Sequence, residues 1–89
     1  MYLHVGKGKN IKDKEIIGIF DLDTATISSI TKGYINKKQK EGRVEYADTD
    51  LPRSFIICKE KGKKEKVVLS RISSTGLKER AQLNIIEEP

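Results

Sequence analysis

The spacing of the apolar residues changes twice along this 89-residue chain, and that change constrains its fold more than any single motif. Residues 15–22 are almost continuously apolar, which is typical of a strand that lies in the centre of a sheet with both faces covered. The apolar residues that follow have the spacing of one helix face: Ile27, Ile30, Tyr34 and Ile35. Gly42 is placed to end this helix, and strand-like segments resume after it. We therefore expect one helix between two groups of strands.

The remaining segments complete an α+β pattern. Four more segments have the composition of strands: 2–5, 44–46, 54–59 and 66–72. Residues 6–10 hold two glycines and an asparagine, and we expect a turn there that uses positive φ angles. Residues 73–75 offer caps to a short C-terminal helix that carries Leu77, Ala81 and Ile85. The order predicts a small mixed or antiparallel sheet of about five strands, with one packed helix and a short C-terminal helix.

The length predicts a single domain, residues 1–89, whose core is small. A chain of this size buries only about 60–65% of its unfolded surface. Cys58 and His4 are the only residues of their types, so an intrachain disulfide is excluded and no zinc-ligand spacing is matched. We expect Cys58, within the apolar run 55–58, to be a buried and unreactive side chain. A small core is usually stabilised by disulfides, a metal or oligomerisation, and because the first two are not expected here, we predict self-association.

Two features predict a cytoplasmic location without contact with a membrane. The lone thiol and the lack of a secretory signal are typical of a reducing compartment. No apolar run approaches the roughly 18–20 residues that a membrane helix needs.

Positive charge is spread over three regions of the chain. Eighteen lysines and arginines outnumber thirteen acids, which gives a net charge of +5. The three clusters are Lys7, Lys9, Lys12 and Lys14; Lys37, Lys38, Lys40 and Arg43; and Lys59, Lys61, Lys63, Lys64 and Lys66. Such cations suit a polyanion, because each one that replaces a condensed counterion adds a salt-dependent, sequence-independent contribution to affinity. The interleaved acids fit a second interpretation, in which the charge only maintains solubility.

No convincing set of catalytic or metal-binding residues is present. His4 is the single imidazole, and a position on a first strand favours a structural role. Asp21 and Asp23 are two residues apart, but two carboxylates without further oxygen ligands make a weak cation site. Residues 6–10 lack the helix start and the Lys-Ser/Thr pair of a phosphate-binding loop. We expect no enzyme activity, no cofactor, no metal and no small-molecule substrate.

Two groups of segments carry a family resemblance. The first comprises residues 1–6 (MYLHVG), 15–22 (EIIGIFDL) and 30–31; the second comprises 41–44 (EGRV), 53–55 (RSF), 69–70, 72–74 and 77–78. Together they resemble the RemB branch of the RemA/RemB extracellular matrix regulators of Gram-positive bacteria. The resemblance extends from residue 1 to about residue 80, and its specificity lies in the whole-length order of segments, because no single motif is diagnostic.

The resemblance implies a cytoplasmic, DNA-binding activator of biofilm-matrix genes, in a family whose RemA branch assembles into rings. RemA-like members carry arginines just before the second strand and in the turn before the fourth. This chain has Glu15 at the first place, with Lys12 and Lys14 nearby. In the second turn it has residues 50–52 (DLP), and only Arg53 remains. This departure fits a branch that binds DNA differently or weakly, or that acts by assembly.

We therefore expect a homo-oligomeric transcriptional regulator that binds duplex DNA through Lys12, Lys14 and Arg53. If sheet pairing brings the two strand starts together, these three cations form one patch, which Glu15 partly offsets. The competing patch is the loop with Lys61, Lys63 and Lys64. The first alternative function is an assembly or interaction protein without nucleic-acid binding, and the second, less favoured, is an RNA-binding module.

Overall fold

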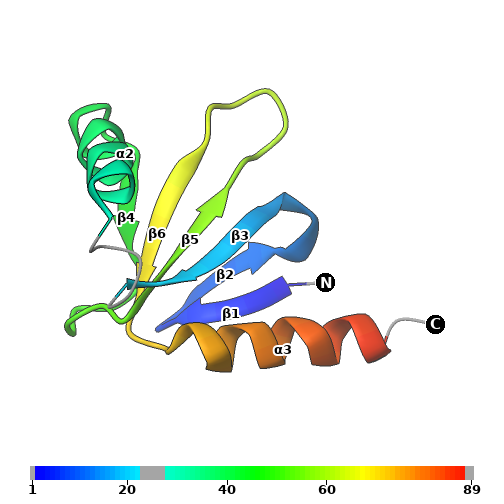
Figure 1. Cartoon of the computed structure of the whole chain (residues 1–89). Helices are drawn as coiled ribbons and strands as arrows, with labels where there is room; N and C mark the ends of the chain where they lie inside the picture. Colours follow the sequence, from blue (N-terminus) through cyan, green and yellow to red (C-terminus); the bar gives the residue numbers. More distant parts are fainter. Residues whose placement is uncertain (1, 23–27, 88–89) are drawn as a thin grey trace.

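The computed structural model describes residues 2–22 and 28–87, and side-chain environments up to residue 81. The elements follow in the order β1 (Tyr2–Gly6), β2 (Lys9–Lys12), the 3₁₀ helix η1 (Asp13–Glu15), β3 (Ile16–Asp21), α2 (Ser29–Lys40), β4 (Val44–Tyr46), β5 (Ser54–Cys58), β6 (Lys66–Ser70) and α3 (Ser74–Glu87). Figure 1 shows their arrangement, which confirms the predicted α+β class.

The strands form two sheets instead of the single sheet expected. The main sheet has the order β3-β5-β6-β4, and it is mixed because β4 runs parallel to β6 while β5 is antiparallel to both of its neighbours. β1 and β2 form a separate antiparallel hairpin. β2 is not predicted from the sequence, because Ile11 is its single apolar residue among polar neighbours. The predicted central position of residues 15–22 is also wrong, because β3 lies at an edge of the sheet.

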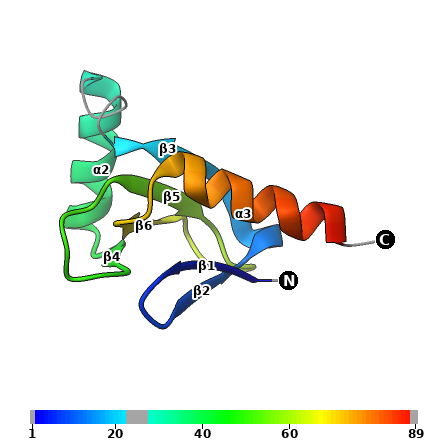
Figure 2. The ribbon, with the colours of Figure 1, turned by 90° about the horizontal axis from the view of Figure 1, so that it is seen from below.

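Each face of the main sheet has its own core. On one face, Phe55, Val67 and Leu69 pack against Tyr34 and Ile35 of α2. On the other face, the hairpin and α3 cover the sheet, as Figures 1 and 2 show. The buried residues on that side are Leu3, Val5, Ile11, Ala47, Ile56, Cys58, Val68 and Leu77. Two-sided burial explains why the middle positions of the central strands β5 and β6 are all apolar.

Local signals position α2 much as the sequence predicts. Ser28 is the N-cap, and its hydroxyl accepts a long hydrogen bond from the backbone N–H of Thr31 at 3.5 Å. Gly42 ends the helix with a φ of 72°, and the backbone bonds from Gly42 to Gln39 and from Arg43 to Lys38 are those of a Schellman motif. The prediction that Ile30 lies on the core face of this helix is wrong, since its side chain is 83% exposed. Ile27 lies outside the described residues.

Three further expectations can be compared with the structure. Cys58 is buried, as predicted, and burial raises the pKa of its thiol. Of residues 6–10, only Gly8 has a positive φ, so Gly6 and Asn10 do not form the turn in the way expected. α3 is longer than the short helix predicted, at 14 residues. Leu77 and Ala81 of this helix pack on the core as expected, whereas the side chain of Ile85 lies outside the described part.

Candidate nucleic-acid interface

The three cations predicted to form one patch lie at two ends of the sheet. Lys12 ends β2 and Lys14 lies in η1, and both line the same hollow of about 210 Å³. Arg53 immediately precedes β5, which pairs with β3 in antiparallel orientation. The start of β5 therefore lies beside the end of β3. The six residues of β3 span about 17 Å, and this length separates Arg53 from Lys12 and Lys14. The expected joining of Lys12 and Lys14 with Arg53 in one subunit is wrong, whereas a role of each residue in DNA binding stays a prediction that the structure does not test.

Several other lysines are held by carboxylates of the same chain. Lys9 of the hairpin and Lys66 of β6 both bind Glu45, which belongs to β4 of the main sheet. In the β5–β6 loop, the Lys63 ammonium lies 2.8 Å from a carboxylate oxygen of Glu60. These cations are partly neutralised, so a count of lysines overstates the charge that is free to meet a ligand.

The Glu45 contact gives a testable pH dependence. The hydrogen bond from Lys9, aided by Lys66 and opposed by burial, holds the pKa of Glu45 below its usual range. A lowered folded pKa stabilises the fold above the unfolded pKa, and this contribution is lost as the pH falls through the folded pKa. We expect Glu45→Gln to cost under about 1 kcal/mol at pH 7, since the carboxylate is partly exposed, and to cost less below about pH 4.

Urea unfolding of Glu45→Gln and of the wild type between pH 3 and pH 7 measures this difference, with Glu79→Gln on exposed α3 surface as the control. A cost that is equal at both ends of the pH range would contradict the assignment.

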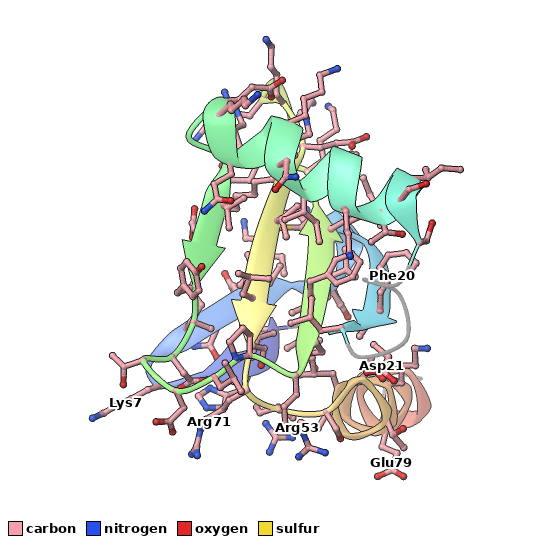
Figure 3. The ribbon with its side chains drawn as sticks, turned by 60° about the vertical axis from the view of Figure 1, so that its left-hand side comes forward. Lys7, Phe20, Asp21, Arg53, Arg71 and Glu79 are labelled. Carbon is pink, nitrogen blue, oxygen red and sulfur yellow. The ribbon has the colours of Figure 1, made fainter. Side chains whose placement is uncertain are left out.

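Sheet register brings two arginines together at the other end. Ser54 of β5 pairs with Ser70 of β6, and the backbone N–H of Arg53 donates to the carbonyl of Ser70 at 2.8 Å. Arg53 precedes the first of these serines and Arg71 follows the second, so the two arginines occupy neighbouring positions. Figure 3 shows both side chains directed away from the same edge of the sheet.

The same two serines fix the backbone around Arg71. The buried hydroxyl of Ser54 donates to the carbonyl of Ile72 at 2.7 Å. The buried hydroxyl of Ser70 accepts from the backbone N–H of Ile72 at 3.1 Å and donates to the carbonyl of Val5. Because these bonds bracket Arg71, its backbone is held in place while its side chain reaches solvent.

Asp48 holds a third basic residue, Lys7, at this edge of the sheet. The Asp48 side chain is only 7% exposed, and its Oδ1 accepts from the backbone N–H of Lys7 at 2.9 Å and lies 3.8 Å from Nε of Arg71. A second carboxylate, that of Asp50, lies 3.4 Å from the same guanidinium. We call Lys7, Arg53 and Arg71 the basic edge. Figure 3 shows the three side chains in a row along it.

A groove of about 800 Å³ lies beside the basic edge. Lys7 and Arg71 line it, together with Arg80 of α3, whose guanidinium donates to the carbonyl of His4 at 3.2 Å. The His4 ring itself is 3.1 Å from the side-chain oxygen of Asn10. His4 is thus part of a structural contact next to a cationic surface.

The described residues include no group of three His, Cys, Asp or Glu side chains that could hold a metal ion. Asp21 lies at the end of β3, but Asp23, its predicted companion, falls outside the described part. No helix within the described ranges is long and apolar enough to cross a membrane.

Sequence reasoning missed Lys7 and Arg71 as companions of Arg53. Lys7 lies in the predicted turn of residues 6–10, and Arg71 lies in the predicted strand of residues 66–72. A hairpin loop over residues 60–65 is predicted from the sequence, and the antiparallel pairing of β5 with β6 that it implies is the signal that could have found them. In such a hairpin, the residue before the first strand and the residue after the second necessarily lie at the same end.

Two comparisons with known proteins match almost the whole chain. The model of the RemA-like family, described as extracellular matrix regulatory protein A-like, matches residues 2–81. The chain is also similar to extracellular matrix regulatory protein B of Bacillus subtilis (strain 168), with 33% identity over 82 residues that cover 92% of this chain and 91% of that protein.

Proposed function

Because the chain belongs to the RemA-like family of extracellular matrix regulatory proteins, we propose that it is a DNA-binding transcriptional regulator of matrix genes that acts as a homo-oligomer. Its place of action is the cytoplasm, its partners are duplex DNA and further copies of itself, and it has no catalytic activity. The family match extends over nearly all of the single domain of residues 1–89.

The observation that carries the DNA-binding proposal is the basic edge. No carboxylate of the described residues lies within ion-pair distance of the Arg53 guanidinium, although Arg71 is its neighbour. Like charges at opposed positions destabilise a sheet unless an anion lies between them. Phosphate oxygens suit this place because guanidinium groups bind them through paired, charge-assisted hydrogen bonds.

Exposed apolar side chains support self-association. A register shift between Ile16 and Gly18 places an extra residue, Ile17, on β3, and its side chain is 57% exposed. Phe20, further along this edge strand, stacks on Phe55 and is still 40% exposed. An apolar hollow of about 330 Å³ opens on the α2 side of the sheet. A second subunit that covered such surface would supply the apolar burial that a small core lacks.

The same apolar surface also favours a second candidate, an assembly protein that does not bind nucleic acid. The two candidates differ in their dependence on salt and on DNA. An electrostatic DNA complex loses affinity steeply as salt rises, because each phosphate contact contributes about −0.9 to the slope of log K against log salt. An assembly held by apolar contacts does not weaken in this way.

We expect the full chain to bind labelled duplex DNA with a steep salt dependence between about 50 and 200 mM salt, measured by fluorescence anisotropy. Competition with structured RNA tests the RNA-binding alternative, and light scattering with and without a long duplex gives the mass of the assembly. A mass of one chain would refute the oligomer. An oligomer that fails to bind duplex DNA at the lowest salt would support the assembly protein instead.

A further inference from the structure

We propose that the basic edge of Lys7, Arg53 and Arg71 is the face that contacts DNA phosphates, and that Asp50 competes with phosphate for Arg71. This inference rests on the proposed DNA-binding function and specifies its surface and its internal control. It selects one end of the sheet over the end that carries Lys12 and Lys14 and over the β5–β6 loop.

Arg53 is the fixed element of this surface. Its backbone N–H donates to Ser70, and its carbonyl accepts from the backbone N–H of Leu22 at 3.0 Å, so both strands next to β5 hold it. Its side chain makes no hydrogen bond or ion pair with the described residues and is directed outward in Figure 3. Because the backbone of Arg53 is already fixed and its side chain has no ion pair to break among the described residues, binding an external anion costs little backbone entropy and breaks no such contact.

Arg71 is the adjustable element. Its side chain is 60% exposed, and its guanidinium is shared between the buried Asp48 and the exposed Asp50. The contact with Asp50 is a surface ion pair at 3.4 Å in which the carboxylate is 69% exposed, and such pairs contribute little to stability. A phosphate can therefore replace Asp50, while Asp48 keeps Arg71 and the backbone of Lys7 in place.

The β5–β6 loop provides a matched comparison. There, Glu60 holds Lys63 in an exposed ion pair, as Asp50 holds Arg71 on the edge. Asp50→Asn and Glu60→Gln each remove one negative charge and one exposed ion pair. The two variants have the same net charge, so a difference in DNA affinity between them reports the position of the phosphate contact.

We expect Asp50→Asn to raise affinity for a labelled duplex, by roughly eightfold at about 0.1 M salt if one more phosphate is bound for each contacting subunit. Glu60→Gln should stay within about twofold of the wild type, because distant charge is screened beyond a Debye length of about 10 Å. A gain in Glu60→Gln and none in Asp50→Asn would overturn the proposal and place DNA on the loop.

A second pair of variants tests the same surface by loss. Lys7→Gln with Arg53→Gln removes two cations whose side chains make no hydrogen bond or ion pair with the described residues, so the fold should be unchanged, as circular dichroism will show. Lys12→Gln with Lys14→Gln removes the same charge at the opposite end of β3. We expect the first pair to reduce the salt slope by about 1.8 for each contacting subunit and the second to leave it unchanged.

These measurements distinguish a failure of the proposed DNA-binding function from a failure of the basic edge as its surface. If the wild type does not bind duplex DNA at low salt, the proposed function is refuted, and the inference with it. If the wild type binds and the loss appears in the Lys12 and Lys14 pair, the function stands and the choice of the basic edge is refuted.

Discussion

Replacement of Leu77 by alanine is expected to lower the free energy of unfolding by about 2–5 kcal/mol. Leu77 is fully buried in the core between the main sheet, the β1–β2 hairpin and α3. Truncation would remove apolar contacts and leave a cavity between three elements that can close only by moving together. Small domains have a total stability of roughly 5–15 kcal/mol, so this loss is large for the chain. Urea unfolding followed by circular dichroism measures it.

Leu51→Ala is the matched control, because the same atoms are removed from a side chain that is 86% exposed. Its cost should remain within about 0.5 kcal/mol. Equal costs for the two leucines would contradict the docking of α3 on the core. If Leu51→Ala instead proves costly in a concentration-dependent way, Leu51 lies in an interface between copies, and the oligomer proposal gains a residue.

Much of the fold could be predicted from apolar periodicity. The segment 44–46 is a strand as expected, the predicted strand 54–59 is observed as Ser54–Cys58, and α2 ends where Gly42 indicates. Periodicity failed where a strand is mostly charged, as in β2, and where an apolar strand lies at an edge, as in β3. Apolar side chains such as Ile17 show that a segment can be apolar and still be exposed in one subunit.

The candidate site was harder to predict, because it depends on strand direction. Arg53 was identified from its sequence context, but its companions depend on whether β5 pairs in antiparallel orientation with β3 and β6. That orientation separates Arg53 from Lys14 and places it next to Arg71. The link to Lys7 depends on Asp48, a side-chain contact between residues 41 positions apart, and no local pattern predicts such a contact.

Gly6→Ala is expected to destabilise the fold by about 1–3 kcal/mol through overpacking. A methyl group at Gly6 would lie 2.6 Å from Cβ of Ala47, 2.7 Å from Oδ2 of Asp48 and 2.9 Å from the carbonyl of Ala47. One of these neighbours is backbone, so the hairpin must move away from the segment after β4. Oδ2 of Asp48 is buried without a hydrogen-bond partner among the described residues, and a shift of this carboxylate would also disturb the contacts of its Oδ1 with Lys7 and Arg71.

Gly33→Ala is the control for this change, since Gly33 lies within α2 and an added Cβ meets nothing within 4 Å. Helix propensity predicts that this variant is more stable than the wild type by about 0.5–1 kcal/mol. The two glycine variants should also differ in DNA affinity, because only Gly6→Ala displaces the carboxylate that holds Lys7 beside Arg71. Full DNA affinity in a folded but destabilised Gly6→Ala protein would show that Asp48 does not organise the basic edge, and would leave Arg53 as its remaining anchor.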